Sequence, residues 1–147
     1  MRALVYAMRF TGQVTPVGIA GDVLEATTTG SGSTLTTTIG PDGLAADLET
    51  LPGGEATFAS EVTFTGETRF QETGTIAFGD HRLRFSTVGS GYLAPGADPR
   101  RQQGAVVWRV ESGEGQFAGA TGLITSNFFV GDDGAVVDHH LGVVILP

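Results

Sequence analysis

The sequence has no cysteine and no lysine, and these two absences remove several kinds of chemistry. Without cysteine there is no disulfide, no thiolate nucleophile and no cysteine-based zinc site. Without lysine there is no Schiff-base chemistry and no phosphate-binding lysine of the Walker type. All eight basic residues are arginine, and sixteen acidic residues bring the formal net charge to −8. This acidic balance argues against a nucleic-acid partner and against an anionic membrane surface, because both require basic side chains.

Long hydrophobic runs are missing as well. No stretch approaches the ~20 apolar residues that a membrane-spanning helix needs. The N-terminal segment MRALVYAMRFTGQ lacks the apolar region and cleavage site of a secretory signal. We therefore expect a cytoplasmic protein, with no membrane partner. A length of 147 residues and an apolar fraction of 40% are enough for one folded core, so we predict a single β-barrel domain over residues 1–147.

Apolar and polar residues alternate along the whole chain, and no window shows the 3.6-residue apolar period of a helix. This pattern predicts an all-β protein whose short loops join antiparallel neighbours. The expected strands cover residues 2–10, 22–29, 33–40, 44–50, 56–65, 68–78, 82–88, 104–111, 121–130 and 135–146. Turn residues separate most of them, including Pro41-Asp42-Gly43, Pro52-Gly53-Gly54 and Gly131-Asp132-Asp133-Gly134.

A run of eight or more such strands closes into a barrel or folds into a sandwich. The loop lengths favour an up-and-down antiparallel barrel of eight strands, or slightly more, and the sandwich is the alternative. Residues 89–103 are the one long loop expected, and a loop of this length often acts as a lid.

Glu72 is the most interesting candidate for chemistry. Strand alternation places it on the same face as Phe70, Ile76 and Phe78. A carboxyl group taken into an apolar interior has its pKa raised, which suits general acid–base catalysis near neutral pH. Two alternatives are an ion pair with an arginine and a bulge at Gly74 that turns Glu72 outward.

Tyr6 and Asn127 are the other catalytic candidates, since a phenol and an amide could donate hydrogen bonds to a developing negative charge. Tyr6 is equally typical of a core residue with its hydroxyl satisfied at one end. The residues expected to contact a substrate are Phe58, Phe70, Phe85, Trp108 and His139.

The three histidines do not suggest a metal site. His139 and His140 are adjacent, so their side chains point to opposite faces of a strand and do not readily chelate one ion. Of the three, we expect only His139 to face the apolar interior, as a possible proton shuttle. No pattern calls for a cofactor, and we expect none.

A glycine-rich segment runs Gly113-Glu114-Gly115-Gln116-Phe117-Ala118-Gly119-Ala120-Thr121-Gly122. Its glycines have the wrong spacing for a dinucleotide site, and no helix follows. We predict a tight turn in which Phe117 closes one end of the barrel. The segment, between VVWRV and an apolar strand, resembles the glycine-rich turn of allene oxide cyclase-like barrels, which include plant allene oxide cyclases and dirigent proteins. It is also similar to a turn in small bacterial calycin-like proteins.

The resemblance implies an eight-stranded barrel with an apolar interior, often oligomeric, that binds a hydrophobic molecule and steers a cyclisation or coupling. No catalytic residue is carried over from it. The sequence thus leaves three functions open: a cofactor-free isomerase or cyclase acting on a polyketide- or fatty-acid-like substrate, a binding protein for an apolar small molecule, and a filled barrel that works by self-association. Because strands 121–130 and 135–146 are apolar on both faces, we expect them at the interface of a homo-oligomer, a dimer or trimer.

Overall fold

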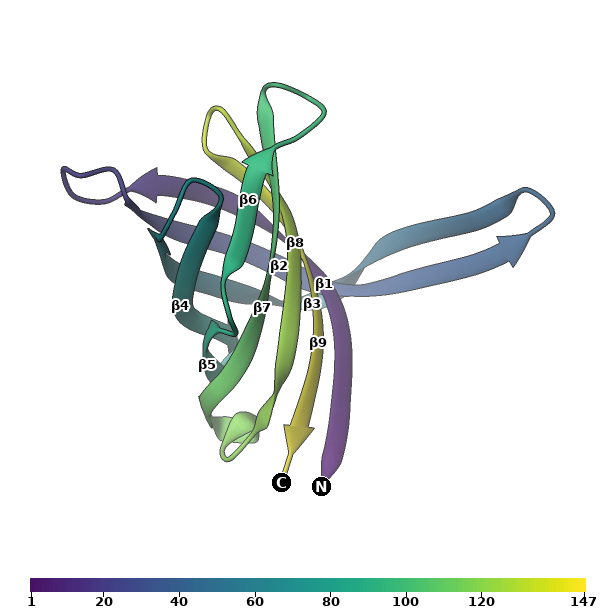
Figure 1. Ribbon diagram of the computed structural model, residues 1–147. Coiled ribbons are helices and arrows are strands. Elements are labelled where there is room, and N and C mark those ends of the chain that lie inside the picture. Colours follow the sequence, from purple (N-terminus) through teal and green to yellow (C-terminus); the bar gives the residue numbers. More distant parts are fainter.

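The computed structural model describes residues 1–147 and contains nine strands and one 3₁₀ turn (Figure 1). The predicted all-β class is confirmed. The elements are β1 (Arg2–Pro16), β2 (Val23–Gly40), β3 (Gly43–Phe64), β4 (Arg69–Phe78), β5 (His81–Thr87), β6 (Gly91–Pro95), β7 (Arg101–Glu114), η1 (Gly115–Phe117), β8 (Thr121–Gly131) and β9 (Ala135–Leu146). The single helical turn is three residues long, so no helix here has the length or apolarity to cross a membrane.

All nine strands belong to one antiparallel sheet that closes into a ring. The strand order is β3-β2-β1-β9-β8-β7-β5-β4, and the pairing of β3 with β4 completes the circuit. The short strand β6 pairs with β4 and β7 at one end of the ring. The two chain termini lie together at the other end (Figure 1). Every strand of the ring therefore has one face toward a shared interior.

Four of the expected strands are in fact two long ones. Residues 22–29 and 33–40 are continuous in β2, and residues 44–50 and 56–65 are continuous in β3. The turn predicted at Pro52-Gly53-Gly54 is wrong, because the chain passes through these residues as a bulge between the pairs Ser33↔Thr50 and Ser31↔Glu55. A proline is tolerated there since β3 pairs with β4 only from Ala56 onward, so no neighbouring strand needs its missing N–H.

The long strands produce a feature that the sequence did not predict. Beyond Ser31, β2 and β3 pair only with each other and project from the side of the ring as a two-stranded ribbon (Figure 1). We call residues 33–50 the arm. Apart from Ser33 and Leu48, which are half-buried, its side chains are exposed.

The prediction of one long loop over residues 89–103 is also wrong. This segment contains β6, a turn over residues 96–100 and the beginning of β7. Gly91, the first residue of β6, lies against the ring of Phe70 so closely that any side chain at position 91 would overlap it. The close contact with Phe70 requires a glycine at the start of β6, and the sequence pattern around Gly91 did not predict a strand there.

Large buried side chains fill the interior of the ring toward the end near the termini. Trp108, Ile76, Leu83, Ile124 and Val144 are completely buried there. As expected, the glycine-rich segment forms a tight turn: Gly115 and Gly119 have φ values of 67° and 74°, which other residues rarely adopt. Phe117 in this turn is buried and contacts Phe78, with 5.5 Å between ring centroids, so it closes this end.

Candidate functional site

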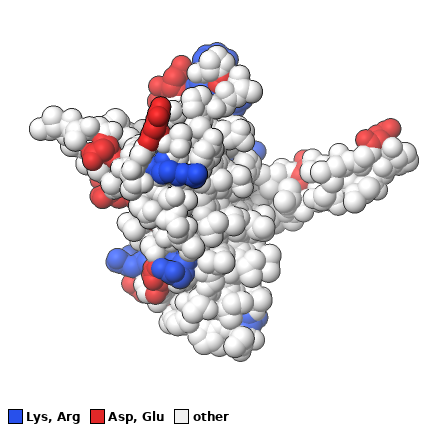
Figure 2. Space-filling model, in the orientation of Figure 1, with Lys and Arg blue, Asp and Glu red and all other residues white.

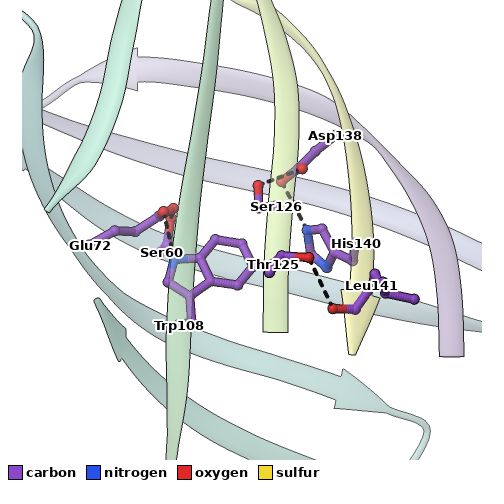
Figure 3. A network of polar contacts seen from close by, with 8 residues as sticks. All are labelled: Ser60, Glu72, Trp108, Thr125, Ser126, Asp138, His140 and Leu141. Atoms are coloured by element: carbon purple, nitrogen blue, oxygen red, sulfur yellow. Dashed lines mark hydrogen bonds and ion pairs between the residues drawn. The ribbon is translucent and has the colours of Figure 1, made fainter. Parts of the chain in front are cut away.

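Glu72 lies inside the ring, as its position in β4 predicted, and its side chain is almost fully buried. Its two oxygens accept hydrogen bonds from different strands (Figure 3). The hydroxyl of Ser60 on β3 donates to Oε1 over 2.6 Å, and the indole Nε1 of Trp108 on β7 donates to Oε2 over 3.0 Å. No arginine pairs with it, and Gly74 does not turn it outward. Gly74 instead makes room for the ring of Phe85.

The backbone of Glu72 is held by the side chain of Thr87. The Thr87 hydroxyl accepts from the Glu72 N–H over 2.7 Å and donates to the Glu72 carbonyl over 2.9 Å. These bonds form at the point where β5 ends and the β4–β5 ladder stops, after the pair Thr73↔Ser86. Both the backbone and the carboxyl group of Glu72 are therefore fixed.

Burial raises the pKa of Glu72 to about 7, from an ordinary value of 4.5. The hydrogen bonds from Ser60 and Trp108 lower the pKa because they favour the ionised form, whereas the nearby charge of Asp138 raises it. Removal from water is the largest of these effects. The carboxyl group therefore exchanges its proton near neutral pH, as a general acid–base group must.

A second polar cluster faces the same interior from β8 and β9. Asp138 accepts a hydrogen bond from the hydroxyl of Ser126 over 2.6 Å, and its other oxygen lies 2.9 Å from Nε2 of His140 (Figure 3). The His140 ring stacks on Phe10 at 4.2 Å and meets Trp108 edge-on at 5.0 Å. Its Nδ1 is buried without a hydrogen-bond partner. Trp108 thus touches both carboxylate clusters, through its N–H and its ring.

The two carboxyl groups line one cavity. The cavity itself has a volume of about 50 Å³. The total empty space, which includes the solvent-filled mouth, is about 490 Å³. A single water needs roughly 10–15 Å³, so the cavity admits a slender group but not a bulky one. Eleven of its fifteen lining residues are hydrophobic. The lining residues are Val14, Leu24, Ala26, Thr28, Phe58, Val62, Phe64, Phe70, Glu72, Leu93, Ser126, Phe128, Val130, Val136 and Asp138.

The cavity mouth lies at the end of the ring away from the termini. Val14 and Leu24 flank the β1–β2 turn there, Val130 and Val136 flank the β8–β9 turn, and Leu93 comes from β6. The polar groups lie deeper. One of them, the hydroxyl of Thr28, is buried and has no hydrogen-bond partner. An unpaired polar atom facing a hollow is a position where a bound molecule can gain a hydrogen bond.

Two expected site residues lie on the wrong side of their strands. Asn127 and His139 are exposed on the outer face of the ring, and they do not reach the cavity. The inward residues are Ser126 on β8 and Asp138 and His140 on β9, so the predicted facing of both strands is wrong. Since these strands are apolar on both faces, hydrophobicity did not identify the buried face.

Tyr6 points inward, as expected, but it does not line the cavity. It packs edge-on against Phe78, 5.6 Å between centroids, and lies over Gly142, where a side chain would overlap the phenol ring. Its hydroxyl is buried without a partner. Burial, together with the charge of Asp138, raises the pKa of Tyr6 far above its ordinary value, so it remains a neutral phenol.

Of the aromatic residues expected to contact a substrate, Phe58 and Phe70 line the cavity. Phe85 and Trp108 form the layer behind it, where Phe85 stacks on Phe58 at 5.4 Å and lies 4.4 Å from Trp108. No three His, Asp or Glu side chains converge in a way that could hold a metal ion.

The chain matches no protein-family model, no curated protein and no solved structure.

Proposed function

We propose that this protein is a cofactor-free isomerase or cyclase in which Glu72 moves a proton on a small apolar molecule. The observation that carries the proposal is a buried carboxyl group with a pKa of about 7, without a cationic partner, at the inner end of an apolar cavity. Perturbed carboxyl groups of this kind are typical of acid–base sites.

The chemistry needs no co-reactant. In its protonated form Glu72 donates its proton to an oxygen of the substrate, a carbonyl or epoxide, as the bonding electrons of the substrate shift. The carboxylate then takes a proton from a substrate carbon, which regenerates the acid and leaves an isomer. Trp108 and Ser60 stabilise the carboxylate between these two steps through the hydrogen bonds described above.

The cavity also restricts the substrate. Glu72 and Asp138 both face it, and no lysine or arginine does, so an entering carboxylate would be repelled and desolvated. A substrate of polyketide or fatty-acid type therefore enters with a neutral, slender end, and any charged head group remains at the mouth. Thr28 supplies a free hydroxyl for the polar atom of that end.

The glycine-rich turn supports a finer proposal, that the ring is a barrel of the allene oxide cyclase-like type. The support is the sequence pattern Gly113-x-Gly115-x-Phe117-x-Gly119 together with a buried Phe117 at the closed end. Proximity in an apolar interior would then assist a cyclisation, because the folded conformation of the substrate is selected on binding.

The test is proton exchange on simple probes. Small linear ketones such as 2-pentanone are incubated with the protein in deuterium oxide, and deuterium uptake next to the carbonyl is followed by NMR. We expect catalysed uptake that is lost in Glu72→Gln and unchanged in Glu61→Gln, which replaces an exposed carboxylate on β3. Uptake that survives in Glu72→Gln would refute the assignment.

A second function is supported by the unpaired Thr28 hydroxyl: binding without turnover. A ligand that hydrogen-bonds to Thr28 would fill the hollow half of the ring while Glu72 remains paired with Ser60 and Trp108. Native mass spectrometry, followed by organic extraction of the purified protein, would detect such a ligand. Tight binding of a probe without any deuterium uptake would favour this function over catalysis.

A further inference from the structure

The arm has two different faces. Cross-strand pairs place Leu35 opposite Leu48 and Ile39 opposite Leu44 on one face, whereas Thr36 and its partner Asp47 belong to the other. Ile39 is 88% exposed, and Leu44 is 72% exposed. A two-stranded ribbon is only marginally stable in water. An apolar face on such a ribbon indicates that something covers it.

The apolar face of the arm looks across a groove at the outside of the ring. Leu35 and Leu48 on the arm and Ala7 and Leu141 on the ring line this groove, whose open volume is about 850 Å³. On the ring side the groove is also lined by polar residues, which are Thr125, Asn127, His139 and His140. An apolar patch on the outside of the ring includes Ala7 and Leu141 and continues beyond the groove. We call it the wall, and it consists of Val5 and Ala7 on β1, Leu141 and Val143 on β9 and Leu123 on β8.

The wall residues are neighbours in the sheet, because Val143 pairs with both Val5 and Leu123. Ala7 is half-buried, and the exposed fractions of the other four run from 43% for Val143 to 65% for Val5. The arm and the wall thus form the two sides of an angle, and each side carries apolar residues. Contiguous exposed apolar surface of this kind marks an interaction site.

We propose that a second copy of this chain fills the angle, in a symmetric dimer where each arm lies on the wall of the other copy. The arm has eight residue pairs, from Ser33↔Thr50 to Gly40↔Gly43. At ~3.3 Å per residue it is about 25 Å long. Strands are ~4.8 Å apart, so four neighbouring strands such as β1, β9, β8 and β7 are about 19 Å wide. One arm therefore reaches across the whole wall of a partner.

Charge favours the same partner. The arm carries Asp42, Asp47 and Glu49 and no basic residue, and Figure 2 shows acidic side chains at its tip on an otherwise largely uncharged ribbon. Arg2 and Arg9 flank the wall on β1, and neither forms an ion pair within the chain. Asp47 and Glu49 lie on the arm face that points away from the wall, so Asp42 at the tip is the acidic residue that can approach the arginines. A two-fold arrangement brings this tip to the arginine-flanked wall of the other copy, and the two contacts are identical.

The test is the mass of the full chain in solution by light scattering at about 10 µM. We expect about twice the chain mass of 15.2 kDa. Ile39→Asp and Leu141→Asp, one on each side of the contact, should each raise the dimer dissociation constant at least about tenfold. Thr38→Asp is the matched control, because it adds the same charge one residue away on the opposite face of the arm.

All three substituted side chains are exposed, so folding should survive, and circular dichroism checks this. A monomer, a trimer or any larger assembly overturns the proposal and points to another occupant of the angle. A dimer that persists in both Ile39→Asp and Leu141→Asp overturns it too, as does equal dissociation by Thr38→Asp. Because none of these positions lines the cavity, the result is independent of the proposed catalysis.

Discussion

Replacing Glu72 by glutamine should change how the stability of the protein depends on pH. The pKa of Glu72 is 4.5 in an unfolded chain and about 7 in the folded protein. Because the folded pKa is raised, the folded state holds the proton more tightly. The stabilisation is complete below pH 4.5 and is lost as the pH rises through about 7.

The magnitude follows from the size of the shift. A difference of about 2.5 pKa units, at 1.36 kcal/mol per unit, corresponds to about 3 kcal/mol. Glutamine cannot ionise, and its side-chain oxygen can still accept a hydrogen bond from Trp108. The free energy of unfolding of wild type should therefore fall by about 3 kcal/mol relative to Glu72→Gln between pH 4.5 and pH 8.

Urea unfolding of both proteins at half-unit pH steps measures this difference directly. Glu61→Gln serves as the control, since Glu61 is exposed and its substitution should leave the wild-type pH profile in place. Parallel profiles for wild type and Glu72→Gln would refute the reasoning, because they would mean that burial does not disfavour the ionised form of Glu72.

Two further substitutions test the packing of the interior. Gly142→Ala should destabilise the fold by about 1–3 kcal/mol, because the new methyl group overlaps the Tyr6 ring, whereas Gly32→Ala meets open space and should change little; thermal unfolding compares the two. Thr28→Val removes a buried hydroxyl that has no partner, so it should stabilise the unliganded protein by about 1 kcal/mol in urea unfolding. A loss of stability in Thr28→Val would show that the hydroxyl is already satisfied.

The all-β class was predictable because strand alternation is a local property. The inward position of Glu72 followed from the same property, since β4 has polar residues such as Gln71 and Thr73 on its outer face. The merging of strands into the arm was not predictable. Pro52, Gly53 and Gly54 usually mark a turn, and only the absence of a neighbouring strand at this edge allows β3 to continue through them.

In strands β8 and β9 the alternation of residues does not predict which face is buried. Each is apolar on both faces, since one face lines the interior and the other forms the wall. The sequence by itself determined the class of fold, the glycine-rich turn and a buried Glu72. Only the tertiary structure decided that Asp138 and His140 face inward while Asn127 and His139 face outward. That choice depends on partners from other strands: the Ser126 hydroxyl donates a hydrogen bond to Asp138, and the rings of Phe10 and Trp108 enclose His140. Alternation separates the two faces of a strand, but only ring closure decides which of them is buried.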